Sequence, residues 1–190
     1  MNQKQAKELV RSRLSDKRYQ HTLNVKKMAV RLARHYGVDK HRAALAALLH
    51  DSAKEMSRDE MKELMRQHPQ DAGDWEQRPP QVWHGICAAI LARTQWGVKD
   101  EAVLSAIACH TAGKPGMSKL DKVIYLADMT SKERDWPGVG RLRKLEMKDL
   151  DKAMLAALGQ TNDFVLSQGK PLDPMSAAAY ADIEARQKKH

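Results

Sequence analysis

The stretch from Ala43 to Lys54 constrains the fold most, because a nearly pure run of alanine and leucine ends in the pair His50-Asp51. A helix that is apolar on all sides belongs in a protein core. An imidazole and a carboxylate at the end of such a helix must find polar partners or bind a cation, since burying either one unpaired is costly. The sequence therefore predicts a buried polar site here that other segments must complete.

The composition favours helix throughout the chain. Glycine and proline are sparse, at 10 and 7 of 190 residues, and no segment alternates as a strand. Apolar spacing and capping residues predict nine helices. They lie at about 3–13, 17–36, from Asp39 into the stretch 43–54, 57–69, 82–95, 101–110, 118–129, 147–167 and after Asp173. We expect loops or turns at 71–80, 111–116 and 136–138. The prediction is an all-α bundle of about eight or nine helices in a single domain, 1–190, with a core of about 17–145 and C-terminal helices, about 147–188, packed on it.

No stretch is apolar enough for a membrane span or a secretion signal. The longest apolar runs, Ala43–Leu49 and Ile86–Ala92, are far shorter than the roughly 20 residues that a span needs. Cys87 and Cys109 lie inside helical apolar patterns and make no disulfide framework, which suits a reducing compartment. We expect a cytoplasmic protein without a membrane partner.

The net charge of +9 is concentrated in the first helices. Residues 1–42 hold 12 Lys and Arg against 3 Asp and Glu, so the other 148 residues balance, at 21 against 21. This asymmetry indicates either a basic face for anionic substrates or nucleic acid, or simply a well-solvated surface. Because no aromatic ladder or nucleic-acid motif accompanies the charge, we do not expect a nucleic-acid partner.

Six polar side chains each lie on the apolar face of a predicted helix: His21, His50, Asp51, His84, His110 and Asp128. A single histidine on such a face is more often a satisfied core residue than a ligand. Six such groups are harder to satisfy separately, at about 1–3 kcal/mol for each one left unpaired. A shared metal site would remove that penalty for all of them.

This donor set suits iron, manganese, zinc, cobalt or nickel better than magnesium alone. Six ligands are too many for one open catalytic zinc but suit two metals, with Asp51 able to bridge them through its two oxygens. Two metals roughly 3.5–4 Å apart can hold a hydroxide and clamp a phosphoryl oxygen. The pattern therefore predicts hydrolysis of phosphoesters or phosphoanhydrides.

His21, the pair His50-Asp51 and Asp128 resemble the H…HD…D signature of the HD-domain metal-dependent phosphohydrolases. These proteins are all-helical, and the resemblance implies an HD-domain helical bundle around a buried di-metal site. More narrowly, four runs between residues 17 and 145 are similar to the YqeK family: His50–Lys54, Trp83–Gly85, His110–Asp128 and Arg134–Val139. Members of that family are symmetrical bis(5'-nucleosyl)-tetraphosphatases, which cut diadenosine tetraphosphate (Ap4A) into two ADP.

The resemblance implies two metal ions, iron foremost, and a role for each ligand. One ion would bind His21, His50, Asp51 and Asp128, and the other Asp51, His84 and His110. A metal-bridging hydroxide would attack a central phosphorus of the dinucleoside polyphosphate. Asp51 and Lys54 would be the catalytic residues.

The same resemblance gives Lys54 and Arg134 contacts to the phosphates. Lys114, in a glycine-flanked loop, is a weaker candidate for a phosphate contact, and an ordinary loop lysine explains it equally well. The chain departs from the family just before Arg134, where Ser131-Lys132-Glu133 stands in place of an expected Glu-Pro pair. That change puts the nucleotide preference in question.

Two other functions fit the same sequence. Another HD phosphohydrolase, such as a nucleotidase or a guanosine polyphosphate hydrolase, would need the same metals. A non-catalytic module could instead bind RNA through the basic first helices. The last helix, around Ala177–Ile183, suggests packing on the core and possible formation of a homodimer.

Overall fold

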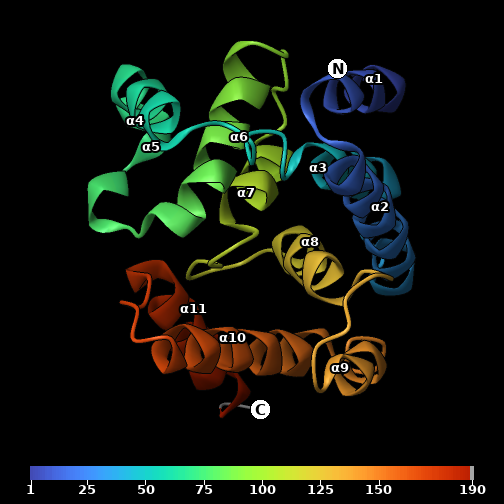
Figure 1. Ribbon diagram of the computed structural model, residues 1–190. Coiled ribbons are helices and arrows are strands. Elements are labelled where there is room, and N and C mark those ends of the chain that lie inside the picture. The colour runs from blue at the N-terminus through green and yellow to red at the C-terminus, as the bar shows by residue number, and fades with distance from the viewer. Residues whose placement is uncertain (189–190) are drawn as a thin grey trace.

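The computed structural model describes residues 1–188, and every regular element in that range is helical. The α-helices are α1 (Gln3–Arg13), α2 (Asp16–Tyr36), α3 (Lys40–Leu49), α4 (Arg58–Gln67), α5 (Pro69–Ala72), α6 (Trp83–Thr94), α7 (Glu101–Cys109), α8 (Lys119–Thr130), α9 (Val139–Leu145), α10 (Leu150–Ser167) and α11 (Pro174–Gln187). Two short 3-10 helices, η1 (Trp75–Gln77) and η2 (Pro80–Val82), precede α6 (Figure 1). The all-α prediction is confirmed. No helix in this range is long and apolar enough to cross a membrane.

Side-chain caps begin several helices close to the starts that the sequence predicted. Ser57 and Ser118 each form a capping box at the start of α4 and α8. Asp39, Asp100 and Asp173 each accept hydrogen bonds from two backbone N–H groups in the first turns of α3, α7 and α11. These local bonds explain why the sequence predicted the starts of these helices to within one or two residues.

The sequence analysis did not predict α5 as a separate helix and did not predict α9. The single turn α5 begins within the fourth predicted helix and runs into an expected loop, and proline occupies its first position. The seven-residue helix α9 buries only Val139 and Leu142, too few positions to show a helical period. In addition, α10 begins at Leu150 rather than near 147, because Asp149 caps it. The described residues therefore form eleven α-helices, slightly more than expected.

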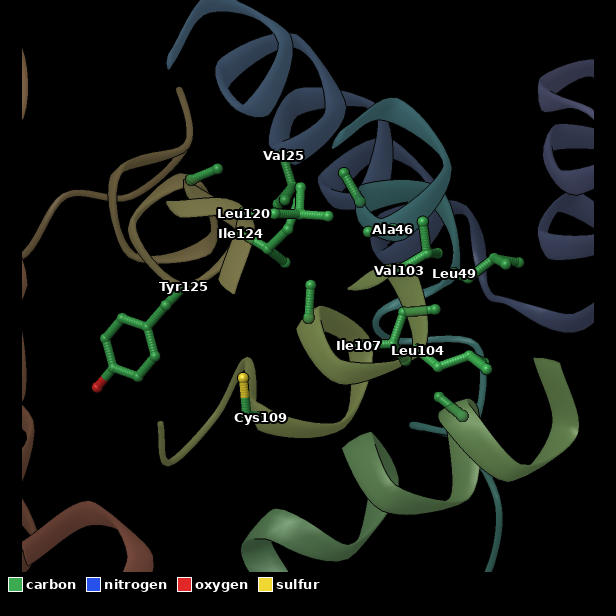
Figure 2. Close-up of a cluster of buried hydrophobic side chains, with 14 of the residues drawn as sticks. Val25, Ala46, Leu49, Val103, Leu104, Ile107, Cys109, Leu120, Ile124 and Tyr125 are labelled. Carbon is green, nitrogen blue, oxygen red and sulfur yellow. The ribbon is translucent and has the colours of Figure 1, made fainter. Parts of the chain in front are cut away.

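Helix α3 lies in the core, where it packs against α1, α2, α7 and α8. Ala43, Ala46 and Ala47 are fully buried, and their small side chains let the neighbouring helices approach closely. Figure 2 shows side chains of α2, α3, α7 and α8 converging in this core, among them Val25, Leu49 and Ile124. This packing brings the carboxyl end of α3, and with it the pair His50-Asp51, into the interior.

The C-terminal helices pack onto α8. In Figure 1, α8 lies between the first seven helices and the group formed by α9, α10 and α11. Helix α10 packs against α8, α9 and α11, and the Tyr125 hydroxyl in α8 donates a 3.2 Å hydrogen bond to Thr161 Oγ1 in α10. The division into a core of about 17–145 and C-terminal helices of about 147–188 stays a prediction. The extent of the domain, 1–190, stays a prediction.

Candidate metal centre

The fold brings all six predicted ligands together from five segments. His50 and Asp51 directly follow α3, and His21 lies in α2. His84 is in the first turn of α6, His110 directly follows α7, and Asp128 is in the last turn of α8. Their ligand atoms form three overlapping sets, in each of which all atoms lie within 4.8 Å of one another: His21, His50 and Asp51; His50, His110 and Asp128; Asp51, His84 and His110.

The two carboxylate oxygens of Asp51 face different histidines. Oδ1 lies 3.3 Å from His84 Nε2 and 3.7 Å from His110 Nε2. Oδ2 lies 3.8 Å from His50 Nε2 and 3.9 Å from His21 Nε2. Asp51 is therefore placed between two groups of nitrogen donors, with one oxygen for each.

Hydrogen bonds from the protein fix the orientation of the imidazoles. His50 Nδ1 lies 2.7 Å from the carbonyl oxygen of Ala47, and His110 Nδ1 lies 2.8 Å from that of Ile107. An Nδ1–H donated to a carbonyl leaves Nε2 with a lone pair directed into the cluster. Among the described residues nothing hydrogen-bonds to the buried Nε2 of His50. A buried acceptor without a partner is costly, and a metal ion at this point would satisfy it.

The protonation states of the cluster suit cation binding. Burial lowers the pKa of both His50 and His84 to about 4, so both imidazoles are neutral near pH 7. Burial would raise the pKa of Asp51, but the surrounding His50, His110 and His84 outweigh it and hold that pKa well below the usual value. Neutral imidazoles around an ionised carboxylate are the donor set that divalent transition metals take.

Two carboxylates hold the ring of His21, one at each nitrogen. His21 Nε2 lies 3.0 Å from Asp128 Oδ1, while its Nδ1 is hydrogen-bonded to Glu133. Glu133 also accepts a 2.7 Å hydrogen bond from the Asn24 amide and a 2.8 Å bond from the Ser131 hydroxyl. Burial would lower the pKa of His21, but Asp128 and Glu133 together raise it above its usual value.

Gly85 allows α6 and α7 to approach closely enough to join His84 and His110. A Cβ atom at Gly85 would lie 3.0 Å from the Ala108 carbonyl oxygen and 3.2 Å from His110 Nδ1. Any side chain there would push the His110 ring away. The Nε2 atoms of the two histidines lie 3.1 Å apart, and each is within 3.2 Å of Thr111 Oγ1.

Comparison with known proteins agrees with this geometry. Residues 18–133 match the HD domain family, and these residues contain all six clustered side chains. The chain belongs to the HD-domain family. It is 39% identical, over 99% of its length and 100% of the relative's, to a Halalkalibacterium halodurans protein named symmetrical bis(5'-nucleosyl)-tetraphosphatase. A Bacillus subtilis protein of the same name is 37% identical over 95% of this chain and 96% of its own.

A solved structure supports the same assignment for this HD-domain protein. An HD superfamily hydrolase from Clostridium acetobutylicum, described as involved in NAD metabolism, superposes with a TM-score of 0.89. The two chains are 35% identical, and the match covers 96% of this chain and 97% of the other. The HD domain match and the named relatives confirm the resemblance to the YqeK family.

An open cleft of about 540 Å³ leads to the cluster of the HD-domain protein. Its lining includes His21, Asp51 and Asp128 of the cluster, and Lys54 and Arg134, the two predicted phosphate contacts. Lys54 Nζ lies 3.9 Å from Asp51 Oδ1 and 3.1 Å from His84 Nε2, and Arg134 Nη2 donates a 2.6 Å hydrogen bond to Asp128. Lys114 is not among the residues that line this cleft, and its Nζ lies 3.9 Å from Asp121 Oδ2.

Arg18 and Glu133 line the cleft, but the sequence analysis assigned neither a role at the site. Arg18 Nη1 lies 3.4 Å from Asp51 Oδ2, with its side chain 37% exposed to the cleft. Arg18 stands one turn before His21 on α2, and this spacing could have identified it. Glu133 gave no such signal, because it reaches His21 from 112 residues away in the sequence.

Proposed function

We propose that this HD-domain protein is a metal-dependent hydrolase that cleaves diadenosine tetraphosphate symmetrically into two ADP. The observation that carries the proposal is the position of Asp51, whose two oxygens each face a separate pair of histidines at the end of a cationic cleft. The names of the Halalkalibacterium and Bacillus relatives support the choice of substrate.

The donor set is suited to two divalent transition-metal ions. His21, His50, Asp51 and Asp128 would hold one ion, and Asp51, His84 and His110 the other. Iron is the metal that we propose first, and manganese, cobalt, nickel and zinc accept the same ligands. When bound, such ions lower the pKa of water and neutralise charge on phosphoryl oxygens.

Four cationic side chains line the cleft where an anionic tetraphosphate would lie: Lys17, Arg18, Lys54 and Arg134. Arg134 donates its Nε–H to the carbonyl oxygen of Asp128 and an Nη2–H to the Asp128 carboxylate. This fixes the guanidinium beside the cluster, and its other N–H groups, which no described residue accepts, are available to phosphate. The Lys54 amine lies between Asp51 and His84, close to the point of attack. These residues would bind the substrate and orient the central phosphates over the cluster.

Product analysis tests the proposal. Purified protein loaded anaerobically with Fe(II), or with Mn(II), is incubated with diadenosine tetraphosphate, and the nucleotides are separated by chromatography. We expect ADP as the sole product. AMP plus ATP would contradict symmetrical attack. An absence of turnover by metal-loaded protein would contradict the proposed substrate and favour another HD phosphohydrolase activity, found by a nucleotide screen.

Replacing Glu133 tests how the cluster is supported. Glu133→Ala removes the carboxylate that orients His21 through Nδ1, and losing such a partner of a ligand typically weakens metal binding about 10- to 100-fold. We expect a loss of that size when a chelator competes for Mn(II). Lys132→Ala, at the exposed neighbouring position, should bind metal like the wild type. Equal metal affinity in both variants would show that Glu133 does not orient a ligand.

A further inference from the structure

A second cavity, of about 290 Å³, lies next to the metal-ligand cluster. It is bounded by η2, the residues after α7, the second half of α10 and the start of α11. This cavity and the cationic cleft share no lining residue. Thr111 connects the cavity to the cluster, because Thr111 lines the cavity and its Oγ1 lies within 3.2 Å of both His84 Nε2 and His110 Nε2. The cluster therefore borders two separate cavities. Asp51 lines the first, and Thr111 lines the second and contacts His84 and His110.

The lining of this cavity suits a flat aromatic ring with polar edges. Val82 and Ala112 contribute apolar surface, and Phe164 is 64% exposed, although a phenylalanine normally packs inside. Asn162 is 9% exposed, and its Oδ1 accepts a 2.6 Å hydrogen bond from the Ser176 hydroxyl. That bond fixes the amide so that its N–H groups, which no described residue accepts, are available to the cavity.

We propose that this cavity binds one nucleoside end of the substrate, with its base stacked on Phe164. The inference rests on the proposed function, because a symmetrical dinucleoside tetraphosphate needs room for one nucleoside on each side of the phosphorus that is attacked. A volume near 290 Å³ is at the lower end for small-molecule sites and suits one nucleoside rather than a whole dinucleotide. The cationic cleft would hold the phosphates and the other end.

The chemistry of the two cavities supports this division. Phosphates need cations, and the cleft residues Arg18, Lys54 and Arg134 supply them. A nucleobase needs an aromatic or apolar face and hydrogen-bonding groups at its edge, and Phe164 and Asn162 supply these in the second cavity. Stacking on an aromatic side chain accepts any base, so the amide of Asn162 would be the group that distinguishes one base from another.

The test compares Phe164→Ala with two matched variants in Mn(II)-loaded protein. Phe164→Trp keeps an aromatic face, and Leu166→Ala removes another exposed apolar side chain of α10 that does not line the cavity. ADP and inorganic pyrophosphate are titrated by calorimetry, and KM is measured for diadenosine tetraphosphate. Since base stacking on an aromatic residue contributes enough for about a fivefold or larger change, we expect Phe164→Ala to weaken ADP binding and raise KM by at least that factor. Pyrophosphate affinity, and both matched variants, should stay at the wild-type level.

Two results would overturn the nucleoside site. One is unchanged ADP affinity and unchanged KM in Phe164→Ala. The other is a change of molecular mass by light scattering in both alanine variants with no effect on ADP, which would make this face an interface between copies of the chain. The experiment is independent of product analysis: ADP binding that depends on Phe164 without tetraphosphate turnover would keep the nucleoside site and remove the proposed function. Symmetrical cleavage with the same KM in Phe164→Ala as in the wild type would keep the proposed function and remove the nucleoside site.

Discussion

Replacing Asp51 by asparagine is expected to lower hydrolysis of diadenosine tetraphosphate by more than about 100-fold. Each oxygen of Asp51 faces a different half of the cluster, so the substitution removes the charge that both halves share and the oxygen that faces one of them. Loss of a group that only supports a ligand already costs about 10- to 100-fold, and loss of a shared ligand should cost more. Activity with saturating Mn(II) and metal content by elemental analysis measure the two effects.

The asparagine variant should keep its fold, which makes the result easy to interpret. Asparagine has nearly the volume of aspartate, and Asp51 is only 4% exposed, so we expect no cavity and unchanged helical content by circular dichroism. Asp59→Asn is the matched control, since that side chain is 96% exposed in the first turn of α4. Normal turnover by Asp51→Asn with a full complement of metal would refute a bridging role for Asp51.

The side chains that form the cluster could be predicted from the sequence because they carry local signals. His50, His84 and His110 each follow or begin an apolar helix, and a polar group at such a position is visible from a window of seven residues. The helix starts could also be predicted from local sequence, because a capping side chain bonds to the backbone only two or three residues away. Which imidazole faces which oxygen of Asp51 depends on how five segments pack, and no local pattern encodes it.

The missed features depend on contacts between distant parts of the chain. Glu133 reaches His21 across 112 residues, and Gly85 matters only because the Ala108 backbone lies against it. Arg18 is close to His21 in sequence, but it was hidden among the 12 basic residues of the first 42. The second cavity joins η2, α10 and α11, so its lining could not be recognised before the fold was known.

A buried carboxyl group outside the cluster of six side chains should make the stability of the protein depend on pH. Glu146 follows α9 and is 1% exposed, and burial raises its pKa to about 7, against the lowering effect of Thr130, Arg31 and Arg143. Thr130 Oγ1 lies 2.7 Å from the Leu126 carbonyl oxygen and 2.9 Å from Glu146 Oε2. The hydroxyl has a single proton for these two acceptors, so Thr130 offsets only part of the cost of burying an ionised Glu146.

Glu146→Gln should therefore remove a loss of stability that the wild type suffers as pH rises. The carboxyl has a pKa of 4.5 when unfolded and about 7 when folded, so its stabilising effect is present at low pH and disappears between about pH 4.5 and 7. Glutamine keeps an oxygen that accepts from Thr130 and does not titrate. Near pH 5 the two proteins should have similar free energies of unfolding, whereas at pH 8 the variant should be about 3 kcal/mol more stable. Urea unfolding at intervals from pH 5 to 8 measures the difference, with the exposed Glu76→Gln as a control that follows the wild type. A constant difference between Glu146→Gln and wild type across this range would mean that Glu146 is ionised in the folded protein.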